Sequence, residues 1–367
     1  MDKLKTLIIL SPGFPRDESD TTCLPSQQVL VRALSEQFPE LQILVLAFQY
    51  PFENCRYVWN GVHIRSFGGS NPGKVKRLVV WMRVWQELRN SLRNGRDGVG
   101  VLSFWLGECA LVGSAFSKFY RLPHYTWVLG QDAKKGNKYF RLIRPSANEL
   151  IAVSDFIADE LERNYSLRPA HVMPVGIDIS AFAPVPQVRD FDILGAGSLI
   201  PLKRYNIFIE VIRELSREFP FIKAVICGSG PQRNSLQRQI EEMGLRERIE
   251  LRGEVSHGEV IELMQRTEVF LHTSEYEGFA AVFAEALYAG AHVVSYCRPV
   301  KEKVEHWHTI NSKEQLLEQM HMLLSEPALA HNRVLYYSSR QIAADLMSVL
   351  SGQVMTKGSD FIRDGAE

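Results

Sequence analysis

The feature that most constrains the fold is a regular alternation of short apolar runs with apolar residues at helical spacing. In the first half of the chain, the apolar runs predict strands at residues 6–10, 42–48, 99–104, 125–128, 150–153 and 171–175. Helical spacing predicts helices at residues 26–36, 75–92, 108–119 and 155–162. The second half repeats the scheme, with strands at 192–195, 223–227, 249–251, 269–272 and 293–295 and helices at 207–219, 232–243, 257–266 and 281–288. This alternation predicts an α/β chain with two doubly wound parallel sheets.

A hinge segment separates the two predicted sheets. Pro174-Val175-Gly176-Ile177-Asp178 and the pair Pro184 and Pro186 interrupt the pattern there. We therefore expect Rossmann-like domains at residues 1–176 and 177–335 that face each other across a cleft. A helix at 336–350 is expected to cross back to the first domain, followed by a frayed tail at 351–367. Ligands of open parallel sheets bind at the carboxyl ends of the strands, so the loops that follow strands hold the candidate residues.

Composition and charge argue against several classes of protein. A chain of 367 residues with 46% hydrophobic residues suits two medium-sized domains, and its net charge of zero does not call for a nucleic-acid partner. Residues 62–147 nevertheless hold 15 Lys and Arg against 4 Asp and Glu, a local excess of +11. The five cysteines are scattered without metal or disulfide spacing, which favours a reducing cytoplasm. The apolar run at 7–10 is too short for a signal peptide or a membrane span.

The most informative segment contains Glu277 and Glu285, eight positions apart. A predicted strand precedes it and a helix follows a short loop, which puts Glu277 in the loop and Glu285 about two turns into the helix. Amides at a helix start favour a phosphate, and a carboxylate can accept hydrogen bonds from two adjacent sugar hydroxyls. This layout indicates a site for a sugar diphosphate. The alternative is a pair of surface glutamates on an ordinary helix.

Other predicted loops carry cations or glycines. Lys203 and Arg204 follow the turn at Gly195-Ala196-Gly197 and stand at a predicted helix start. Cations are unfavourable at a helix start, so a bound anion explains the two residues better than the alternative that they are merely solvated. Gly228 and Gly230 let the backbone approach a ligand closely. The segment Gly253-Glu254-Val255 is a candidate edge for a nucleotide base.

Three other interpretations of these loops fit poorly. A dinucleotide fingerprint would need a third glycine and an acidic residue at the expected distance, and neither is present after Gly197. The segment that begins at Gly228 lacks the Lys-Ser/Thr of a phosphate-binding P-loop. Asp190 and Asp192 resemble a metal-binding pair but precede their strand, so we do not assign them to a metal site.

Taken together, residues 190–295 resemble the donor-binding half of the retaining glycosyltransferases of the large glycogen-synthase-like family four, which have the GT-B fold. Val175-Gly176-Ile177-Asp178 resembles the hinge motif of that family. The resemblance is strong over residues 151–295 and weak over the first 150. It implies a metal-independent hexosyltransferase that retains anomeric configuration, with a nucleotide sugar as donor substrate and no other cofactor.

The resemblance also implies roles for individual residues. Glu277 would contact the donor hexose and, with Lys203, form the catalytic pair; Glu285 would hold the ribose hydroxyls, and Arg204 would join Lys203 on the diphosphate. The remaining donor-binding positions implied are Ser198, Gly228, Gly230, Val255, Gly278, Phe279, Ala280 and Ala281.

Four positions depart from the family pattern. Ser198 stands where an arginine is usual, Thr21-Thr22 where a glycine pair is usual, and Leu129 where a histidine is frequent. Tyr296-Cys297-Arg298-Pro299 replaces a loop with a glycine pair. Two alternatives therefore stay open: a catalytically silent homologue that binds nucleotide sugar as a scaffold, and a sugar-nucleotide epimerase or phosphorylase on the same fold. His124 either supplies the missing imidazole or is a structural residue of its strand.

The acceptor would bind the first domain, where the basic excess lies. Its candidate residues are Gly13, Gly130, Asp132, Lys134 and Lys135, and its expected class is a glycan or lipid-linked acceptor in bacterial-type polysaccharide or glycolipid assembly. The predicted helix at 75–92 carries Trp81 and Trp85 among cations, so it either lies on an anionic membrane or buries its tryptophans in the core. We expect a cytoplasmic protein, peripheral on the inner face of the membrane if the first alternative holds.

Overall fold

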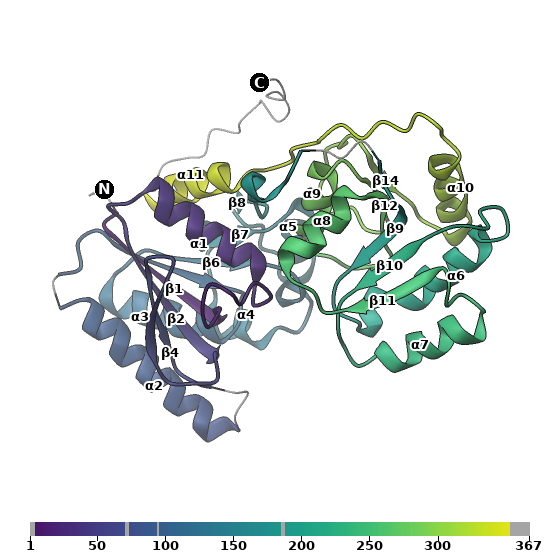
Figure 1. Cartoon of the computed structure of the whole chain (residues 1–367). Coiled ribbons are helices and arrows are strands. Elements are labelled where there is room, and N and C mark those ends of the chain that lie inside the picture. The colour runs from purple at the N-terminus through teal and green to yellow at the C-terminus, as the bar shows by residue number, and fades with distance from the viewer. Residues whose placement is uncertain (1–3, 70–72, 94, 185–187, 280, 353–367) are drawn as a thin grey trace. The chain divides into compact units, whose positions relative to one another are not determined.

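The computed structural model describes residues 4–69, 73–93, 95–184, 188–279 and 281–352 (Figure 1). Within these residues the chain forms two compact units, one of residues 4–176 with 339–352 and one of residues 177–338. The division therefore falls in the segment around Gly176. Pro186 and the tail from residue 353 onward lie outside the described residues.

The first unit is built on an eight-stranded sheet with the order β3-β4-β2-β1-β5-β6-β7-β8 in the described residues. Its strands are β1 (Thr6–Gly13), β2 (Gln42–Tyr50), β3 (Arg56–Trp59), β4 (Val62–Ser66), β5 (Val99–Phe104), β6 (His124–Val128), β7 (Leu150–Ala152) and β8 (His171–Val172). All neighbouring strands pair in parallel except β3 and β4. Every residue of β5 is buried, which explains its continuous apolar sequence, because helices cover both faces of a doubly wound sheet.

Helices lie on both faces of this sheet (Figure 1). They are α1 (Pro25–Gln37), α2 (Lys74–Ser91), α3 (Glu108–Tyr120), α4 (Lys138–Ile143), α5 (Asp155–Tyr165) and α11 (Ser339–Leu350). The apolar side chains of α2 and α3 pack on β1, β2 and β5 in one buried cluster that includes Val84, Leu88 and Phe116. Burying this stripe is what stabilises amphipathic helices on a sheet.

The hairpin of β3 and β4 was not among the predicted strands. Asn60 and Gly61 connect the two strands with φ angles of 44° and 79°, the left-handed conformation that a two-residue hairpin turn requires. Val62, Ile64 and Ser66 are buried while His63 is exposed, so β4 has the alternation of an edge-side strand. The Asn-Gly dipeptide was therefore a sequence signal for this hairpin.

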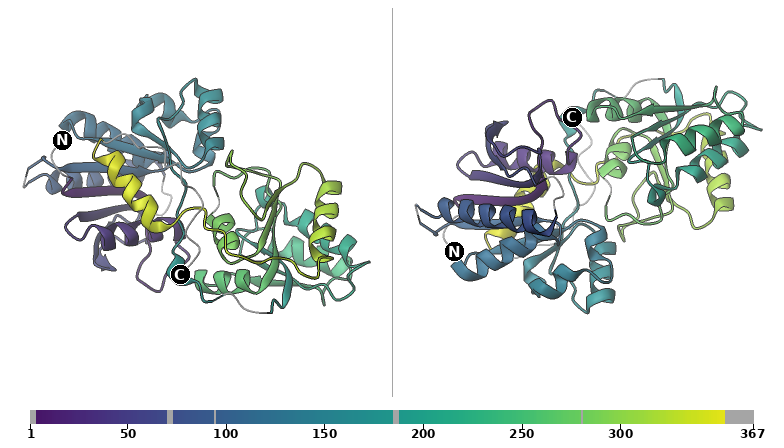
Figure 2. Two further views of the ribbon diagram at one scale, coloured as in Figure 1. Left: turned by 90° about the horizontal axis from the view of Figure 1, so that it is seen from above. Right: turned by 90° about the horizontal axis from the view of Figure 1, so that it is seen from below.

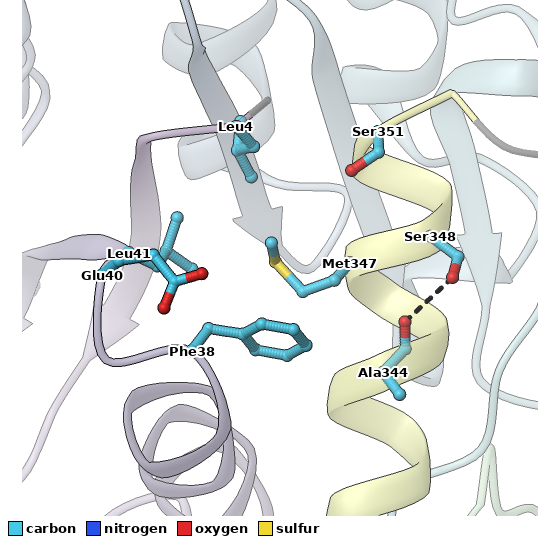
Figure 3. Close-up of a pocket in the computed structure, with 8 residues that line it drawn as sticks. All are labelled: Leu4, Phe38, Glu40, Leu41, Ala344, Met347, Ser348 and Ser351. Carbon is cyan, nitrogen blue, oxygen red and sulfur yellow. Dashed lines mark hydrogen bonds between the residues drawn. The ribbon is translucent and has the colours of Figure 1, made fainter. Parts of the chain in front are cut away.

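Helix α11 packs on the first unit beside α1, as both views in Figure 2 show. The Gln37 side chain donates to Arg340 O over 3.0 Å, and Tyr125 Oη donates to Val349 O over 3.0 Å. A hollow of about 410 Å³ lies beside α11, and Met347 points into it between Leu4 and Phe38 (Figure 3). The chain thus leaves the first unit after Gly176 and returns to it at Ser339, so that α11 belongs to the first unit.

The second unit contains a six-stranded, fully parallel sheet with the order β11-β10-β9-β12-β13-β14 in the described residues. Its strands are β9 (Phe191–Ala196), β10 (Ala224–Cys227), β11 (Ile249–Gly253), β12 (Thr267–His272), β13 (His292–Ser295) and β14 (Trp307–Thr309). Its helices are α6 (Tyr205–Leu215), α7 (Arg233–Glu242), α8 (His257–Gln265), α9 (Ala281–Tyr288) and α10 (Lys313–Leu324).

The prediction of two doubly wound parallel sheets is confirmed. Each predicted strand and helix forms, with ends that differ by at most four residues. Helix α8 begins with a capping box, because the Ser256 hydroxyl accepts from Glu259 N while the Glu259 carboxylate accepts from Ser256 N. Besides the hairpin and four 3-10 helices of three residues each, the elements of the described residues that were not predicted are α4, β14 and α10.

Candidate active site

The candidate residues of the second unit gather at the carboxyl edge of its sheet. The chain places β10 on one side of β9 and β12 on the other, so the strand order reverses between β9 and β12. Loops that leave two adjacent strands in opposite directions open a crevice at such a switch point, where α/β sheets bind their ligands. Lys203 follows β9 and Glu277 follows β12, so both lie at this point.

Glu277 is held by two partners at the switch point. The Lys203 ammonium donates to Glu277 Oε1, and His272 Nε2 lies 2.9 Å from the same oxygen. The Glu277 side chain is 13% exposed and that of Lys203 is 17% exposed. Burial opposes ionisation of this carboxyl, but the hydrogen bond from His272 and the charge of Lys203 lower its pKa from 4.5 to about 2. Glu277 is therefore a carboxylate at neutral pH.

His272 is the last residue of β12 and is buried, with its ring edge-on to Phe283 of α9 at 4.8 Å. Burial lowers the pKa of His272, while its hydrogen bond to Glu277 opposes that shift. A neutral imidazole with its proton on Nε2 donates to Glu277 and adds no second charge to the site. His272 therefore orients the carboxylate.

The two cations at the start of α6 already have carboxylate partners. Lys203 pairs with Glu277, and the Arg204 guanidinium pairs with Glu275 and lies 5.0 Å from the ring centroid of Tyr296. The glutamates of the β12 loop thus partner both cations, and the bound anion that we expected beside them stays a prediction. The Thr273 hydroxyl donates to Lys203 O over 2.7 Å, which ties the loops after β9 and β12 together.

The loop after β13 closes one side of this group. Tyr296 packs against Arg204, and Cys297 O accepts a hydrogen bond from the Ser295 hydroxyl over 2.7 Å. Burial and the nearby charge of Glu277 raise the pKa of the Cys297 thiol to about 12. The segment that replaces the usual glycine-pair loop thus contributes an aromatic ring and a neutral thiol to the site.

Glu285 has a different partner from Glu277. It is the fifth residue of α9, so it lies little more than one turn from the helix start and not two turns as we expected. Its side chain is buried, and Glu285 Oε1 lies 2.8 Å from Nε2 of His257, the first residue of α8. Lys203 and Glu277 are therefore in contact, whereas Glu285 belongs to a second pair.

The glycines of the β9 and β10 loops are required by contact between backbones. A Cβ on Gly228 would lie 1.9 Å from Gly197 O, and one on Gly230 would lie 2.5 Å from Leu199 O. Their φ angles of 142° and 156° are also conformations that side chains disfavour. In the structure these glycines allow the close packing of two loops, and the predicted approach of the backbone to a ligand stays a prediction.

The remaining donor-side candidates surround this region. Ser198 is exposed, Val255 is partly buried, and Gly278 and Phe279 are buried. The Phe279 ring stacks on Tyr336 with centroids 5.6 Å apart. Ala281 is the first residue of α9, and Ala280 lies outside the described residues.

Asp190 and Asp192 are both engaged in structural contacts. Asp190 pairs with Arg266, and Asp192 accepts a hydrogen bond from Lys223 N over 2.7 Å. Both residues lie at the amino-terminal end of β9, at the edge of the sheet opposite to the candidate site.

In the first unit, Asp132 organises the loops after β5 and β6. Its carboxylate accepts hydrogen bonds from Leu106 N over 2.7 Å and Gly130 N over 2.8 Å. Burial raises the pKa of Asp132, and these backbone hydrogen bonds oppose the shift. Gly13 ends β1, beside Tyr50 of β2. These positions lie at the carboxyl edge of the first sheet, whose order reverses between β1 and β5.

The other candidates of the first unit are two lysines after β6 and a histidine at its first residue. Lys134 is partly buried and Lys135 is exposed, and both follow the short helical turn Gln131–Ala133. His124 is buried in β6 with Nε2 2.9 Å from the Ser103 hydroxyl, and burial lowers its pKa to about 3. His124 is therefore a neutral structural residue of the sheet and does not supply a catalytic imidazole.

A comparison with protein families identifies the unit that carries this geometry. Residues 178–340 match the family described as Glycosyl transferases group 1. The matched residues begin one position after the start of the second unit and extend through it. The second unit is a group 1 glycosyl transferase domain. It is this domain that contains Lys203, Glu277 and Glu285.

The chain as a whole has the GT-B fold. It superposes on Anabaena HepE in complex with UDP-glucose with a TM-score of 0.67 and 17% identity, covering 95% of each chain. It is 25% identical over 277 residues to an uncharacterized glycosyltransferase of Methanocaldococcus jannaschii, which covers 72% of this chain and 73% of the relative. Over 164 residues it is 29% identical to the gpi3 subunit of phosphatidylinositol N-acetylglucosaminyltransferase from Schizosaccharomyces pombe. That match covers 43% of this chain and 36% of the relative, little more than a third of its length.

Sequence reasoning missed two residues of the glycosyl transferase domain. His272 was seen only as the end of a strand, and His257 only as the start of a helix. A histidine at the carboxyl end of a buried strand, five residues before Glu277, was a usable signal for the first. Nothing in the sequence pairs His257 with Glu285, because the two residues are 28 positions apart on different helices.

Proposed function

We propose that this protein transfers a hexose or N-acetylhexosamine from a UDP-sugar to the hydroxyl of a glycan or lipid-linked acceptor. The observation that carries the proposal is the ionised Glu277, held by Lys203 and His272 at the switch point of a group 1 glycosyl transferase domain. The donor class is supported by HepE, which binds UDP-glucose, and by the gpi3 subunit, whose name specifies N-acetylglucosamine.

Glu277 would hold the donor sugar. Both of its contacts use Oε1, and among the described residues Oε2 has no hydrogen-bond partner. An ionised carboxylate with one oxygen available accepts a hydrogen bond from a sugar hydroxyl and cannot donate a proton at neutral pH. Its role would therefore be to position the hexose.

Lys203 would hold the diphosphate. An ammonium has three N–H donors, and the contact with Glu277 uses one of them. The other two can donate to the diphosphate while Glu277 grips the sugar that it carries. In the reaction, the bond from the anomeric carbon to the diphosphate oxygen breaks and a bond to the acceptor hydroxyl oxygen forms, and the hydroxyl proton leaves with the diphosphate. A cation fixed beside the departing oxygen stabilises the charge that develops there.

Glu285 would hold the nucleoside. His257 contacts Oε1 of Glu285, which leaves Oε2 to accept hydrogen bonds from ribose hydroxyls. In this arrangement His257 orients Glu285 as His272 orients Glu277. We further propose that transfer retains the anomeric configuration and needs no metal, because Lys203 and Arg204 supply the positive charge at the diphosphate.

The acceptor side and the compartment complete the proposal. Lys134 and Lys135, in the basic part of the first unit, would attract a phosphorylated or lipid-linked acceptor. The reaction would take place in the cytoplasm, which agrees with the five cysteines all being free.

Calorimetric titration with UDP-glucose, UDP-N-acetylglucosamine, GDP-mannose and ADP-glucose tests the donor. We expect a UDP-sugar to bind, Glu277→Gln to weaken its binding at least about tenfold, and the matched variant Glu262→Gln on the exposed side of α8 to bind as the wild type does. Unchanged binding by Glu277→Gln, or no binding of any of the four, would refute the site assignment.

Transfer itself needs a second measurement. Proton NMR of the product reports the anomeric configuration, and activity after treatment with EDTA reports metal dependence. Inverted product or loss of activity in EDTA would contradict those parts of the proposal. Donor binding without hydrolysis or transfer to any acceptor tested would instead favour the silent homologue, which the exposed Ser198 in place of an arginine motivates.

A further inference from the structure

The outer face of α2 exposes large apolar side chains to solvent. Val75 is 78% exposed, Leu78 55% and Met82 56%. Their spacing of three and four residues places them on one stripe of the helix. Phe119 on the neighbouring helix α3 is 72% exposed. Helices α2 and α3 lie side by side in the first unit (Figure 1).

The tryptophans of α2 lie on the side of this stripe that faces α3. Trp85 packs edge-on against Phe116 of α3 with centroids 5.0 Å apart, and Trp81 Nε1 donates to the Glu108 carboxylate over 3.2 Å. The tryptophans thus pack against the core, as the second alternative predicted, and the apolar residues that α2 leaves exposed are Val75, Leu78 and Met82. With four residues of α2 and α3 they line an apolar groove of about 420 Å³, whose lining is Trp81, Met82, Trp85, Leu111, Val112 and Ala115.

Positive charge borders the apolar stripe. Lys76, Arg83 and Arg89 of α2 are exposed, and none of them has a carboxylate partner among the described residues. The acidic residues of these two helices are Glu87 and Glu108, and both are already paired, with Arg56 and Arg77. The face therefore carries uncompensated cations around an apolar centre.

We propose that this face of the first unit, defined by Val75, Leu78, Met82 and Phe119 with their bordering cations, docks on the surface of an anionic lipid bilayer. Apolar side chains enter the boundary between headgroups and acyl chains, while the cations remain at the headgroups. Each cation near an anionic surface strengthens binding about fivefold. A nucleic acid would match the charge but not the exposed aliphatic stripe, and no helix within the described ranges is both long and apolar enough to cross a bilayer.

The proposal deepens the proposed function, because docking would bring the enzyme to a lipid-linked acceptor. Binding to lipid is nevertheless measured without donor, acceptor or turnover. A failure of vesicle binding and a failure of donor binding are therefore separate results, and either can occur without the other.

Co-sedimentation of the full chain with lipid vesicles tests the proposal. One set of vesicles is phosphatidylcholine alone, and the other is phosphatidylcholine with phosphatidylglycerol in equal parts. The test variant is Leu78→Glu/Met82→Glu. The matched control is Phe221→Glu/Met322→Glu in the second unit, where the two replaced side chains are 89% and 59% exposed and the change in net charge is the same.

We expect the wild type and the control to bind the anionic vesicles, with binding that weakens as salt rises. Binding to phosphatidylcholine alone should be much weaker, and the test variant should bind the anionic vesicles at least about tenfold less than the control. Equal binding by the two variants, or no vesicle binding by the wild type, overturns the proposal. The proposal is also overturned if the wild type is retained on immobilised heparin but does not bind vesicles, because the cations would then bind a soluble polyanion and not a lipid surface. Circular dichroism of both variants checks that they fold.

Discussion

Removal of the Lys203 ammonium should destabilise the second unit because it leaves Glu277 buried without its cation. The pKa of Glu277 lies at about 2 instead of 4.5 despite burial, owing to His272 and Lys203 together. At about 1.4 kcal/mol per pKa unit, this difference corresponds to roughly 3 kcal/mol in favour of the charged carboxylate. His272 still donates to Glu277 in Lys203→Met, so only part of this stabilisation is lost with the cation. Because removing one partner of a buried ion pair costs about 3–5 kcal/mol, we expect Lys203→Met to lower the free energy of unfolding by about 3 kcal/mol at neutral pH. The double variant Lys203→Met/Glu277→Gln should lower it by only about 1 kcal/mol, because a neutral amide replaces the unpaired charge.

Urea unfolding followed by circular dichroism measures these free energies, and hydrogen exchange of β12 assigns the change to the second unit. Lys303→Met, at an exposed position of the same unit, is the control and should change stability little. A carboxyl with a lowered pKa stabilises the fold above its unfolded pKa of 4.5, and that contribution is lost as the pH falls through about 2. The difference in free energy of unfolding between the wild type and Lys203→Met should therefore shrink as the pH approaches 2. Equal destabilisation in the single and double variants, or a gap independent of pH, would show that Lys203 does not hold the Glu277 charge.

Three further predictions concern the second unit. Gly228→Ala should lower the free energy of unfolding by about 3 kcal/mol or prevent folding, because the added Cβ would lie 1.9 Å from Gly197 O. The control Gly258→Ala has no atom within 4 Å of the added Cβ and should leave the thermal unfolding temperature nearly unchanged. The buried His292 stacks on His306, and burial lowers its pKa from 6.5 to about 4. Between these two pH values the unfolded chain binds a proton at His292 and the folded protein does not, so the free energy of unfolding should fall by about 3 kcal/mol as the pH drops from 6.5 through about 4. Replacement of His292 by Gln should flatten that part of the urea-midpoint profile, and an unchanged profile would exclude His292 as its origin. Glu285→Ala should weaken binding of a UDP-sugar about tenfold or more in calorimetry, and wild-type affinity would remove Glu285 from the donor site.

Local patterns determined most of the secondary structure. The continuous apolar run of β5 was predicted with both ends correct because it is buried on both faces, and α9 was predicted with both ends correct because its apolar spacing follows a clear loop. The ends of β8 and α6 were wrong by three and four residues, since tertiary contacts and not local preference end those elements. The hairpin at Asn60-Gly61 was missed although its turn signal is present.

The sequence by itself also determined which loops carry the candidate chemistry, because each follows a recognisable strand. Only the tertiary structure decided which side chains meet. Lys203 and Glu277 are 74 positions apart and come together because β9 and β12 are neighbours in the sheet, an order that no local pattern encodes. The pairing of Glu285 with His257 and the contact of Gly228 with Gly197 have the same origin. Spacing along the chain specifies the period of an element, whereas contacts between elements depend on how the whole sheet buries its apolar faces.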